Sequence, residues 1–532
     1  MIGRKRITAA SMAAVLMMGD RKMKKIIAAG LLTVIAANVI TGCVSETPTV
    51  PETEPSESVT ETEEELPELT IDILKSLDGV TRVEDISIPE DAYIGIQHGS
   101  ISDVKNYVVY FEQPLDWNDP SKGTFEQRVS IGYNEASVNE FYVGGYYLND
   151  YTLISASYMD AYAASHVVNF ISCEYRFFGQ SRPEDLDNHD PKYWDCLTSY
   201  NAACDFHHII SELKKVLPAK WMMTGASKGG IATMVQSMYF PEDANVFVPQ
   251  IAPVMTSPQE EIFIKNIYET IGDDRYGPEQ AAEYRKLVLD FQVEAIKNRD
   301  ELQDRCCDYL LANGDVYSDI ATPEIIYEFL VHGFAIRTWQ YAQDFESIQT
   351  VLDQKGEEGY IDGIYYLLTG DKPPVENGPE DANTKLDPLP YDYYPYYVQC
   401  MKELGYFRVD FSYLRAAFEA DGSGAELAVT EDMEDMLSLK LFLHPEVLDT
   451  LSFDRTLHDD LVTWSQTTEC NVIVLFGGSD VWYPLRLPDV PDRENFHTFV
   501  DDFSAHGSIY SRINLYSRYD IQELIDESLR NA

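Results

Sequence analysis

A serine, an aspartate and a histidine occur in this chain in the order and local settings that nucleophilic catalysis requires. Ser227 lies in Gly225-Ala226-Ser227-Lys228-Gly229, a G-x-S-x-G motif. An apolar, strand-like segment, 221–224, precedes the motif and a helical pattern, 231–239, follows it. A serine on a strand-to-helix turn exposes its Oγ above the sheet, where a neighbouring base can activate it. Ser227 is therefore the predicted nucleophile.

The base and the acid that orients it are expected at later strand ends. The buried-strand pattern of 471–476 leads through two glycines to Asp480. His506 follows 26 residues later, in a loop between the last expected strand and the last expected helix. The order serine, acid, histidine, each past the carboxyl end of a strand, is that of an α/β-hydrolase triad. We therefore predict Asp480 as the acid and His506 as the base.

Other candidates for these two roles are less well placed. His497 begins the last expected strand, at the wrong end of the sheet, and Asp489 and Asp492 lie in a proline-rich loop too far from the strand end. None of them displaces Asp480 or His506.

Acyl transfer also needs two backbone donors for the developing oxyanion. The N–H of Lys228, directly after the nucleophile, is the first expected donor. The second is expected in the loop after the strand-like segment 140–143, where Gly144-Gly145-Tyr146 follows. Gly145 and Tyr146 are both candidates, and the sequence does not choose between their N–H groups.

These residues require a sheet whose strands end at a common edge. Before and around Ser227, short β-like segments and helical patterns alternate, which favours a mostly parallel sheet covered on both faces. Between the nucleophile and the acid the patterns are helical, for example at 278–299 and 323–341. The prediction is an α/β-hydrolase fold with a large helical cap, its core formed by 71–255 and 464–532 and its cap by 256–463.

The N-terminal region predicts export. Met23-Lys24-Lys25 precedes an apolar segment, 26–40, and Thr41-Gly42-Cys43 follows, as in a secretory signal with a bacterial lipobox. Residues 1–43 are therefore expected to be a signal segment, with Cys43 carrying the lipid that anchors the protein to the membrane at the cell surface. Residues 44–70 are rich in Glu, Thr, Pro and Ser and predict a flexible tether.

Composition narrows the range of partners. The 89 acidic residues against 40 basic ones give a net charge of −49, which disfavours binding to nucleic acid. Neither a C-x-x-C pair nor an H-E-x-x-H sequence occurs, so no metal site and no cofactor are predicted. No feature of the sequence predicts an oligomeric state.

Two segments resemble one peptidase family. The first is Glu174-Tyr-Arg-Phe-Phe-Gly-Gln-Ser-Arg-Pro183 and the second is Thr224-Gly-Ala-Ser-Lys-Gly-Gly230. Together they are similar to the secreted tripeptidyl aminopeptidases, which are related to the prolyl carboxypeptidase-type peptidases. The lysine after the serine and the double glycine are distinctive. The alanine before the serine departs from the glycine expected there.

The resemblance implies a serine peptidase that removes short peptides, of the tripeptide type, from free N-termini under a helical cap. It also supports Ser227, Asp480 and His506 as the triad. The Glu174 carboxylate would hold the pocket or the substrate ammonium, or else form an ion pair with Arg176 or a neighbouring loop. A tyrosine cluster in the cap would line the cleft or pack the cap onto the core: Tyr391, Tyr393, Tyr394, Tyr396 and Tyr397.

Two other functions remain open at this stage. The same triad hydrolyses esters, so a carboxylesterase or lipase is one alternative. A surface lipoprotein that binds peptides without cleaving them is the other. The intact serine, aspartate and histidine favour catalysis, and the acidic cap favours peptides over lipids.

Overall fold

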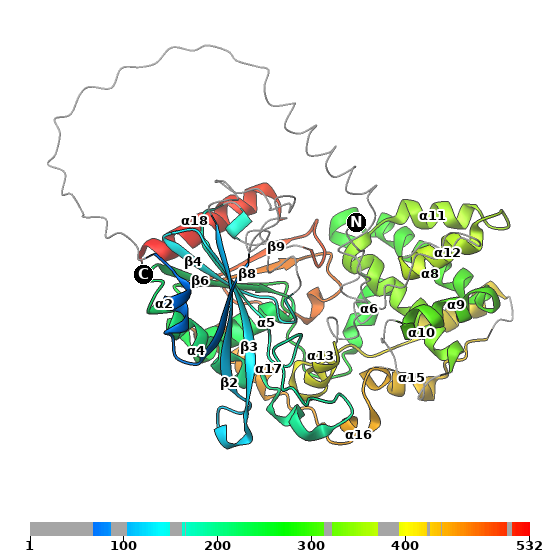
Figure 1. Ribbon diagram of the computed structural model, residues 1–532. Helices are drawn as coiled ribbons and strands as arrows, with labels where there is room; N and C mark the ends of the chain where they lie inside the picture. The colour runs from blue at the N-terminus through cyan, green and yellow to red at the C-terminus, as the bar shows by residue number, and fades with distance from the viewer. Residues whose placement is uncertain are drawn as a thin grey trace, which may run out of the picture.

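A nine-stranded sheet and a separate group of helices make up the two lobes of the computed structural model (Figure 1). The structure describes residues 68–86, 104–148, 162–164, 166–312, 322–370, 393–422, 426–437, 439–507 and 513–531. The expected signal segment, Cys43, nearly all of the tether and Tyr391 lie outside these residues. In the described part of the chain, no helix combines the length and the apolar character needed to cross a membrane.

The sheet is antiparallel at one side and parallel across the rest. Its spatial order is β1 (Val80–Asp85), β2 (Lys105–Pro114), β3 (Thr124–Tyr133), β5 (Asn169–Cys173), β4 (Val138–Val143), β6 (Lys220–Ala226), β7 (Val246–Gln250), β8 (Val472–Gly477) and β9 (Phe496–Asp501). Every pair from β5 to β9 is parallel. The carboxyl ends of β4, β6, β8 and β9 therefore meet at one edge, which positions the catalytic candidates.

Helices cover both faces of the parallel part (Figure 1). On one face lie α4 (Ser199–Lys214), α5 (Lys228–Tyr239) and α17 (Thr456–Thr467), and on the other lies α18 (Leu515–Asn531). Side chains of β6 are buried on both faces of the sheet. Trp221 and Met223 enter the core on the α5 side, whereas Met222 packs with Ile521 of α18. A strand buried on both faces needs apolar residues at successive positions.

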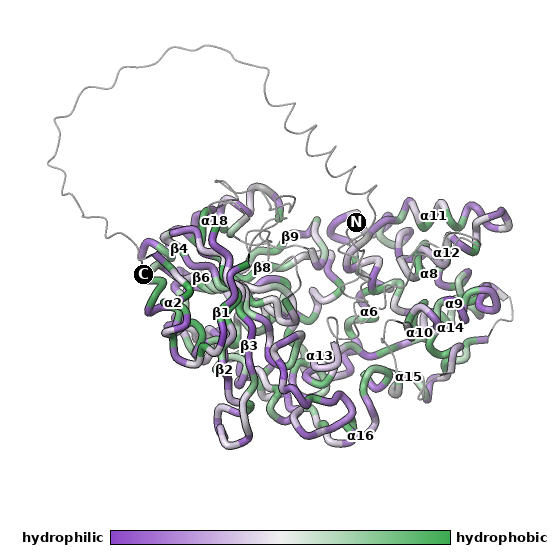
Figure 2. The backbone as a smooth tube through the Cα atoms, in the orientation of Figure 1, coloured by the Kyte–Doolittle hydropathy of each residue, from purple (hydrophilic) through white to green (hydrophobic). Residues whose placement is uncertain are grey.

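The helical lobe is inserted between β7 and β8, and we call it the cap. Its principal helices are α6 (Glu261–Glu269), α7 (Asp273–Tyr276), α8 (Pro278–Lys297), α9 (Arg299–Ala312), α10 (Pro323–Arg337), α11 (Phe345–Asp353), α12 (Tyr360–Thr369), α13 (Tyr394–Gln399), α14 (Ser412–Asp421), α15 (Glu431–Leu437) and α16 (Pro445–Leu448). Two π-helical turns, η8 (Thr338–Ala342) and η9 (Cys400–Leu404), extend α10 and α13. Helix α11 alternates apolar and hydrophilic residues, as expected of an amphipathic helix (Figure 2).

The predicted α/β-hydrolase fold is confirmed by this mostly parallel sheet, in which the G-x-S-x-G turn joins a buried strand to a helix. Two local predictions differ from the structure. Strand β1 was not expected. The segment Ser257-Pro258-Gln259-Glu260 predicts a capping box and a helix from Pro258, but the helix begins only at Glu261. The Glu260 carboxylate accepts from Thr256 instead of closing a capping box, and the Glu260 N–H donates to the Tyr406 carbonyl at 2.8 Å. Tertiary pairing with the 406–408 segment therefore replaces the first helical turn.

Candidate active site

Ser227 occupies a strained turn between β6 and α5. Its backbone angles are φ 57° and ψ −121°, which a residue with a side chain rarely adopts. The N–H of Ser227 donates to the Gln250 carbonyl at 2.9 Å, which ties the turn to the end of β7. A Cβ on Gly229 would lie 1.9 Å from the Val143 carbonyl oxygen, so only glycine lets α5 start this close to β4.

Asp480 and His506 form a buried pair at the same edge of the sheet. The His506 Nδ1 lies 2.7 Å from the Asp480 Oδ2, and both side chains are almost completely buried. The other carboxylate oxygen of Asp480 accepts from the Trp482 N–H at 3.1 Å. A carboxylate fixed in this way holds the imidazole in the tautomer whose Nε2 can accept a proton.

The loops that carry this pair are joined by hydrogen bonds. Parallel pairing of β8 with β9 places Gly477 opposite Asp501. Beyond the strands, the Ser479 N–H donates to the Ser504 carbonyl at 3.0 Å, and the Ser479 hydroxyl donates to the Asp502 carbonyl at 2.8 Å. The acid and the base are therefore held by one connected pair of loops.

The cap contributes directly to the position of His506. The backbone N–H of His506 donates to the Gln340 carbonyl at 3.2 Å, and the Tyr341 ring meets the imidazole edge-on with centroids 5.9 Å apart. Both cap residues belong to η8. Sequence reasoning missed them, because no motif marks the end of α10 as a neighbour of a loop 166 positions later.

The structure brings Asp480 and His506 together but, among the described residues, does not join the His506 ring to the Ser227 hydroxyl by a hydrogen bond. Hydrogen bonds of this kind are often long without substrate and tighten only in the complex. The geometry thus places the oriented imidazole of His506 and the half-buried Ser227 at one sheet edge.

Three backbone N–H groups near Ser227 are free to bind an oxyanion. In the described part of the chain, the N–H groups of Gly145, Tyr146 and Lys228 donate to no other residue. Gly145 has φ 76°, and a Cβ there would lie 2.7 Å from the Gly229 nitrogen. The loop after β4 therefore lies directly against the N-terminus of α5, where helix geometry leaves donors unpaired.

The side chain of Lys228 turns back into the core and fastens this loop. Its Nζ donates to the Gly145 carbonyl at 2.8 Å and lies 2.9 Å from the centroid of the Tyr175 ring. Phe178 packs on the same nitrogen at 5.0 Å. Burial lowers the pKa of Lys228 well below that of a free lysine. The sequence pointed to the Lys228 N–H but not to this role of its side chain.

Tyr146 presents a hydroxyl as well as an N–H to the nucleophile. The pKa of its phenol is raised well above the usual value by burial, and a hydrogen-bonding interaction with Ser227 partly opposes the rise. Its ring packs against Tyr393 and Tyr396 of the cap, with centroids 5.2 and 5.6 Å away. Tyr146 thus joins the serine to the aromatic wall of the cleft.

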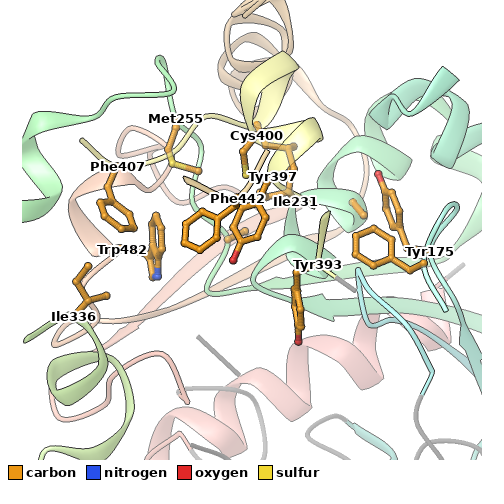
Figure 3. Packing of buried hydrophobic residues seen from close by; sticks show 14 of the residues in the cluster. Tyr175, Ile231, Met255, Ile336, Tyr393, Tyr397, Cys400, Phe407, Phe442 and Trp482 are labelled. Atoms are coloured by element: carbon orange, nitrogen blue, oxygen red, sulfur yellow. The ribbon is translucent and has the colours of Figure 1, made fainter. Parts of the chain in front are cut away.

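A pocket of about 860 Å³, part of it open to solvent, extends from Ser227 into the cap. Most of its lining is aromatic or aliphatic, and Figure 3 shows Tyr397 beside Phe442 and Phe407 beside Trp482. From the predicted tyrosine cluster, Tyr393, Tyr396 and Tyr397 line the pocket, whereas the Tyr394 hydroxyl accepts from the His444 N–H. No aspartate or glutamate occurs among the described lining residues. Such a site suits an apolar acyl chain.

Glu174 does not reach this pocket. Its side chain is fully buried and forms an ion pair with Arg128 at 2.6 Å. It also accepts from the N–H groups of Leu148, Gln180 and Ser181. The expected alternative partner, Arg176, instead binds Asp205 through two bonds of 2.7 Å. Glu174 therefore organises the loop after β5 and does not contribute to the described lining of the pocket.

Two groups of side chains in the described chain have metal-ligand chemistry: Asp78, His208 and Glu212, and His207, Glu242 and Asp243. Both are centred on α4, and neither contributes to the pocket lining. Glu212 already pairs with Lys215, and Asp243 pairs with His207.

Comparison with known proteins agrees with this chemistry. The sequence profile of the PS-10 peptidase S37 family matches residues 75–422. The chain is 25% identical over 420 residues to the prolyl tri/tetrapeptidyl aminopeptidase of Streptomyces mobaraensis, and the match covers 75% of each protein.

Solved structures show a more distant likeness. Proline iminopeptidase of Mycobacterium smegmatis is 15% identical at a TM-score of 0.30, covering 80% of this chain and 100% of that one. The peroxisomal α/β-hydrolase Lpx1 of Saccharomyces cerevisiae is 10% identical at 0.32, covering 81% and 90%. At such scores the fold class rests on the sheet itself.

Proposed function

Because the chain belongs to the PS-10 peptidase S37 family, we propose that this serine hydrolase releases short peptides, of the tripeptide type, from free N-termini. The observation that carries the proposal is the set of groups at one sheet edge. Ser227 stands on its strained turn, the buried Asp480–His506 pair lies at the same edge, and an aromatic pocket runs from the serine into the cap. A pocket that runs from the serine into a cap is compatible with an acyl chain of limited length.

In the proposed mechanism, the Ser227 Oγ attacks the scissile carbonyl carbon while the His506 Nε2 takes the hydroxyl proton. Asp480 stabilises the resulting imidazolium. The carbonyl oxygen gains negative charge and accepts from the N–H of Lys228 and from Gly145 or Tyr146. His506 then protonates the leaving amine, which gives an acyl-enzyme. Water then attacks the ester of the acyl-enzyme while His506 takes its proton. His506 returns the proton to the Ser227 oxygen, and the short peptide is released.

The name of the Streptomyces relative guides the choice of substrate. That protein is named a prolyl tri/tetrapeptidyl aminopeptidase. The aromatic walls of the pocket here suit a compact apolar ring. We therefore propose a tripeptide ending in proline as the first substrate to assay.

The test compares one tripeptide–aminomethylcoumarin with its N-acetylated twin and with a simple p-nitrophenyl ester. We expect the free peptide to be cleaved at least about 100-fold more efficiently than the acetylated one, because acetylation removes the charge of the amino group and adds bulk at that end of the peptide. Equal rates on the two peptides would point to an endopeptidase. Cleavage of the ester alone would point to an esterase.

We also propose that the protein is exported and held at the bacterial cell surface by lipid on Cys43. The support is the basic start, the apolar segment and the lipobox in the sequence. Peptides outside the cell would then be the substrates.

A further inference from the structure

One polar side chain in the wall of the pocket has no partner for one of its ring nitrogens. His332 lies on α10, lines the pocket with Ser227, and is 1% exposed. Its ring packs near Phe411 and Phe329, with centroids 4.8 and 6.5 Å away. No described residue forms a hydrogen bond with the His332 Nδ1. Buried polar atoms in proteins nearly always have partners, so this nitrogen calls for a ligand.

The contact of the other ring nitrogen, Nε2, shows whether the Nδ1 of His332 donates or accepts a hydrogen bond. The His332 Nε2 lies 3.2 Å from the Asp410 carbonyl oxygen. A carbonyl oxygen only accepts, so the Nε2 carries the hydrogen, and in a neutral ring the Nδ1 then presents a lone pair. Burial also lowers the pKa of His332 to about 4, which keeps the ring neutral near pH 7. His332 thus offers a neutral hydrogen-bond acceptor.

Aromatic rings in the cap connect the residue beside the nucleophile with His332. A series of ring contacts leads away from Tyr146, which adjoins Ser227: Tyr146–Tyr396 at 5.6 Å, Tyr396–Tyr397 at 5.6 Å, Tyr397–Phe442 at 4.4 Å, Phe442–Phe329 at 5.6 Å and Phe329–His332 at 6.5 Å. Figure 3 shows the Tyr397–Phe442 contact in the middle of this series. A peptide that follows this wall from Ser227 would bring its amino end beside His332.

The aromatic lining and the neutral acceptor are compatible with a donor that is an amine. The described lining holds no carboxylate, and Glu174 is already fully engaged away from it. Aromatic faces attract a cation through their quadrupoles. A neutral imidazole acceptor adds direction to that attraction without placing an unpaired negative charge in an apolar pocket.

We propose that the Nδ1 of His332 accepts a hydrogen bond from the N-terminal amino group of the bound peptide. This inference rests on the proposed aminopeptidase function and names the group that reads the free N-terminus. His332 is then a specificity-determining residue of the cap.

Two substitutions distinguish the effect of the Nδ1 acceptor from the effect of losing the rest of the imidazole ring. His332→Gln places a donor where the Nε2 was, toward the Asp410 carbonyl, and has no acceptor at the δ position. His332→Asn retains an oxygen at the δ position. The substrates are a tripeptide–aminomethylcoumarin and its desamino twin, in which hydrogen replaces the amino group. The quantity measured is the ratio of their kcat/KM values.

In the wild-type protein we expect the free amine to be preferred by about tenfold or more, the effect of a hydrogen bond to a charged group. The preference should collapse in His332→Gln and persist within about threefold in His332→Asn. An undiminished preference in His332→Gln overturns the proposal. Equal losses in both variants also overturn it, because the effect would then come from ring packing. Thermal unfolding of each purified variant checks that it is folded.

A measurement on the wild-type protein keeps the proposal testable if the variants do not fold. The free tripeptide and its desamino twin are compared as competitive inhibitors, and equal inhibition constants overturn the role of the acceptor. Failure of the His332 proposal can be distinguished from failure of the proposed aminopeptidase function. A wild-type protein that cleaves neither peptide substrate contradicts both, whereas an amine preference that survives in His332→Gln contradicts only the role of His332.

Discussion

The side-chain nitrogen of Lys228 donates to the carbonyl oxygen of Gly145 across 2.8 Å, and so joins the residue after the nucleophile to the loop after β4. The two backbones already touch, because a Cβ on Gly145 would lie 3.1 Å from the Lys228 carbonyl carbon. The same two residues offer free N–H groups beside Ser227 in the described structure. One side chain therefore sets the spacing between the expected oxyanion donors.

Replacing this lysine should impair the chemical step more than substrate binding. We expect Lys228→Met to lower kcat about 100-fold, comparable to the loss of one oxyanion donor, and to change KM by less than about threefold. Methionine fills a similar volume without a donor. Steady-state kinetics with separate kcat and KM values check this, alongside thermal unfolding. A folded Lys228→Met protein with wild-type kcat would contradict the role.

Ser227→Ala should abolish hydrolysis while the fold persists. Loss of a triad serine typically lowers kcat by about 10⁶. The matched control is Ser237→Ala, on the same helix, whose buried hydroxyl makes no hydrogen bond with the described residues. Activity of the purified Ser227→Ala protein within about tenfold of the control would rule out the nucleophile.

Asp480→Asn tests the pair at the sheet edge. An amide in place of the carboxylate favours the wrong imidazole tautomer and no longer stabilises the imidazolium, and we expect kcat to fall by about 10⁴. The control is Asp492→Asn, which removes the exposed partner of His497 in the loop after β8 and should leave kcat within about twofold. Similar kcat values for the two variants would argue against Asp480 as the acid.

Glu140 predicts a pH-dependent stability. This fully buried carboxyl on β4 accepts from the Ala163 N–H, and burial raises its pKa to about 8 from 4.5. Between these values the folded protein holds a proton that the unfolded chain has lost, so stability should fall as pH rises from about 4.5 to 8. The effect is on the order of a few kcal/mol.

Glu140→Gln should remove this dependence. The variant should be more stable than the wild type at pH 8 and similar at pH 4.5, measured by denaturant unfolding at each pH. Parallel pH curves for the two proteins would show that Glu140 does not titrate as inferred.

Cys43→Ala tests the proposed anchor. Stable membrane attachment takes two or more acyl chains, and the Glu- and Thr-rich tether offers no other apolar surface. We expect the signal-cleaved variant to leave the membrane fraction, as followed by fractionation and mass spectrometry of the N-terminus. Retention of the cleaved variant in the membrane would contradict the proposal.

The sheet and its strand ends were predictable because their signals are local. The segments 471–476 and 221–224 are apolar at successive positions, and the structure has β8 and β6 there. Parallel strands share an edge, so residues just past two such segments had to lie near each other. The Asp480–His506 contact follows from this reasoning.

Long-range side-chain contacts, in the sheet domain as well as in the cap, could not be predicted in the same way. Glu174 pairs with Arg128, 46 positions earlier, rather than with the adjacent Arg176. His332 lies within an apolar helical pattern that predicts burial but not which ring atom remains unpaired. Such assignments depend on long-range packing, which periodicity does not encode.

The hydrogen bond from His506 to Gln340 has a consequence for access to the cleft. This bond attaches the loop of His506 to the cap, so the position of the imidazole depends on the position of the cap. A displaced cap that admits substrate and a seated cap that supports His506 would then be two alternative states of the protein. With the cap displaced, the enzyme would hydrolyse poorly, and a folded protein that contacts it in that state would not be cleaved.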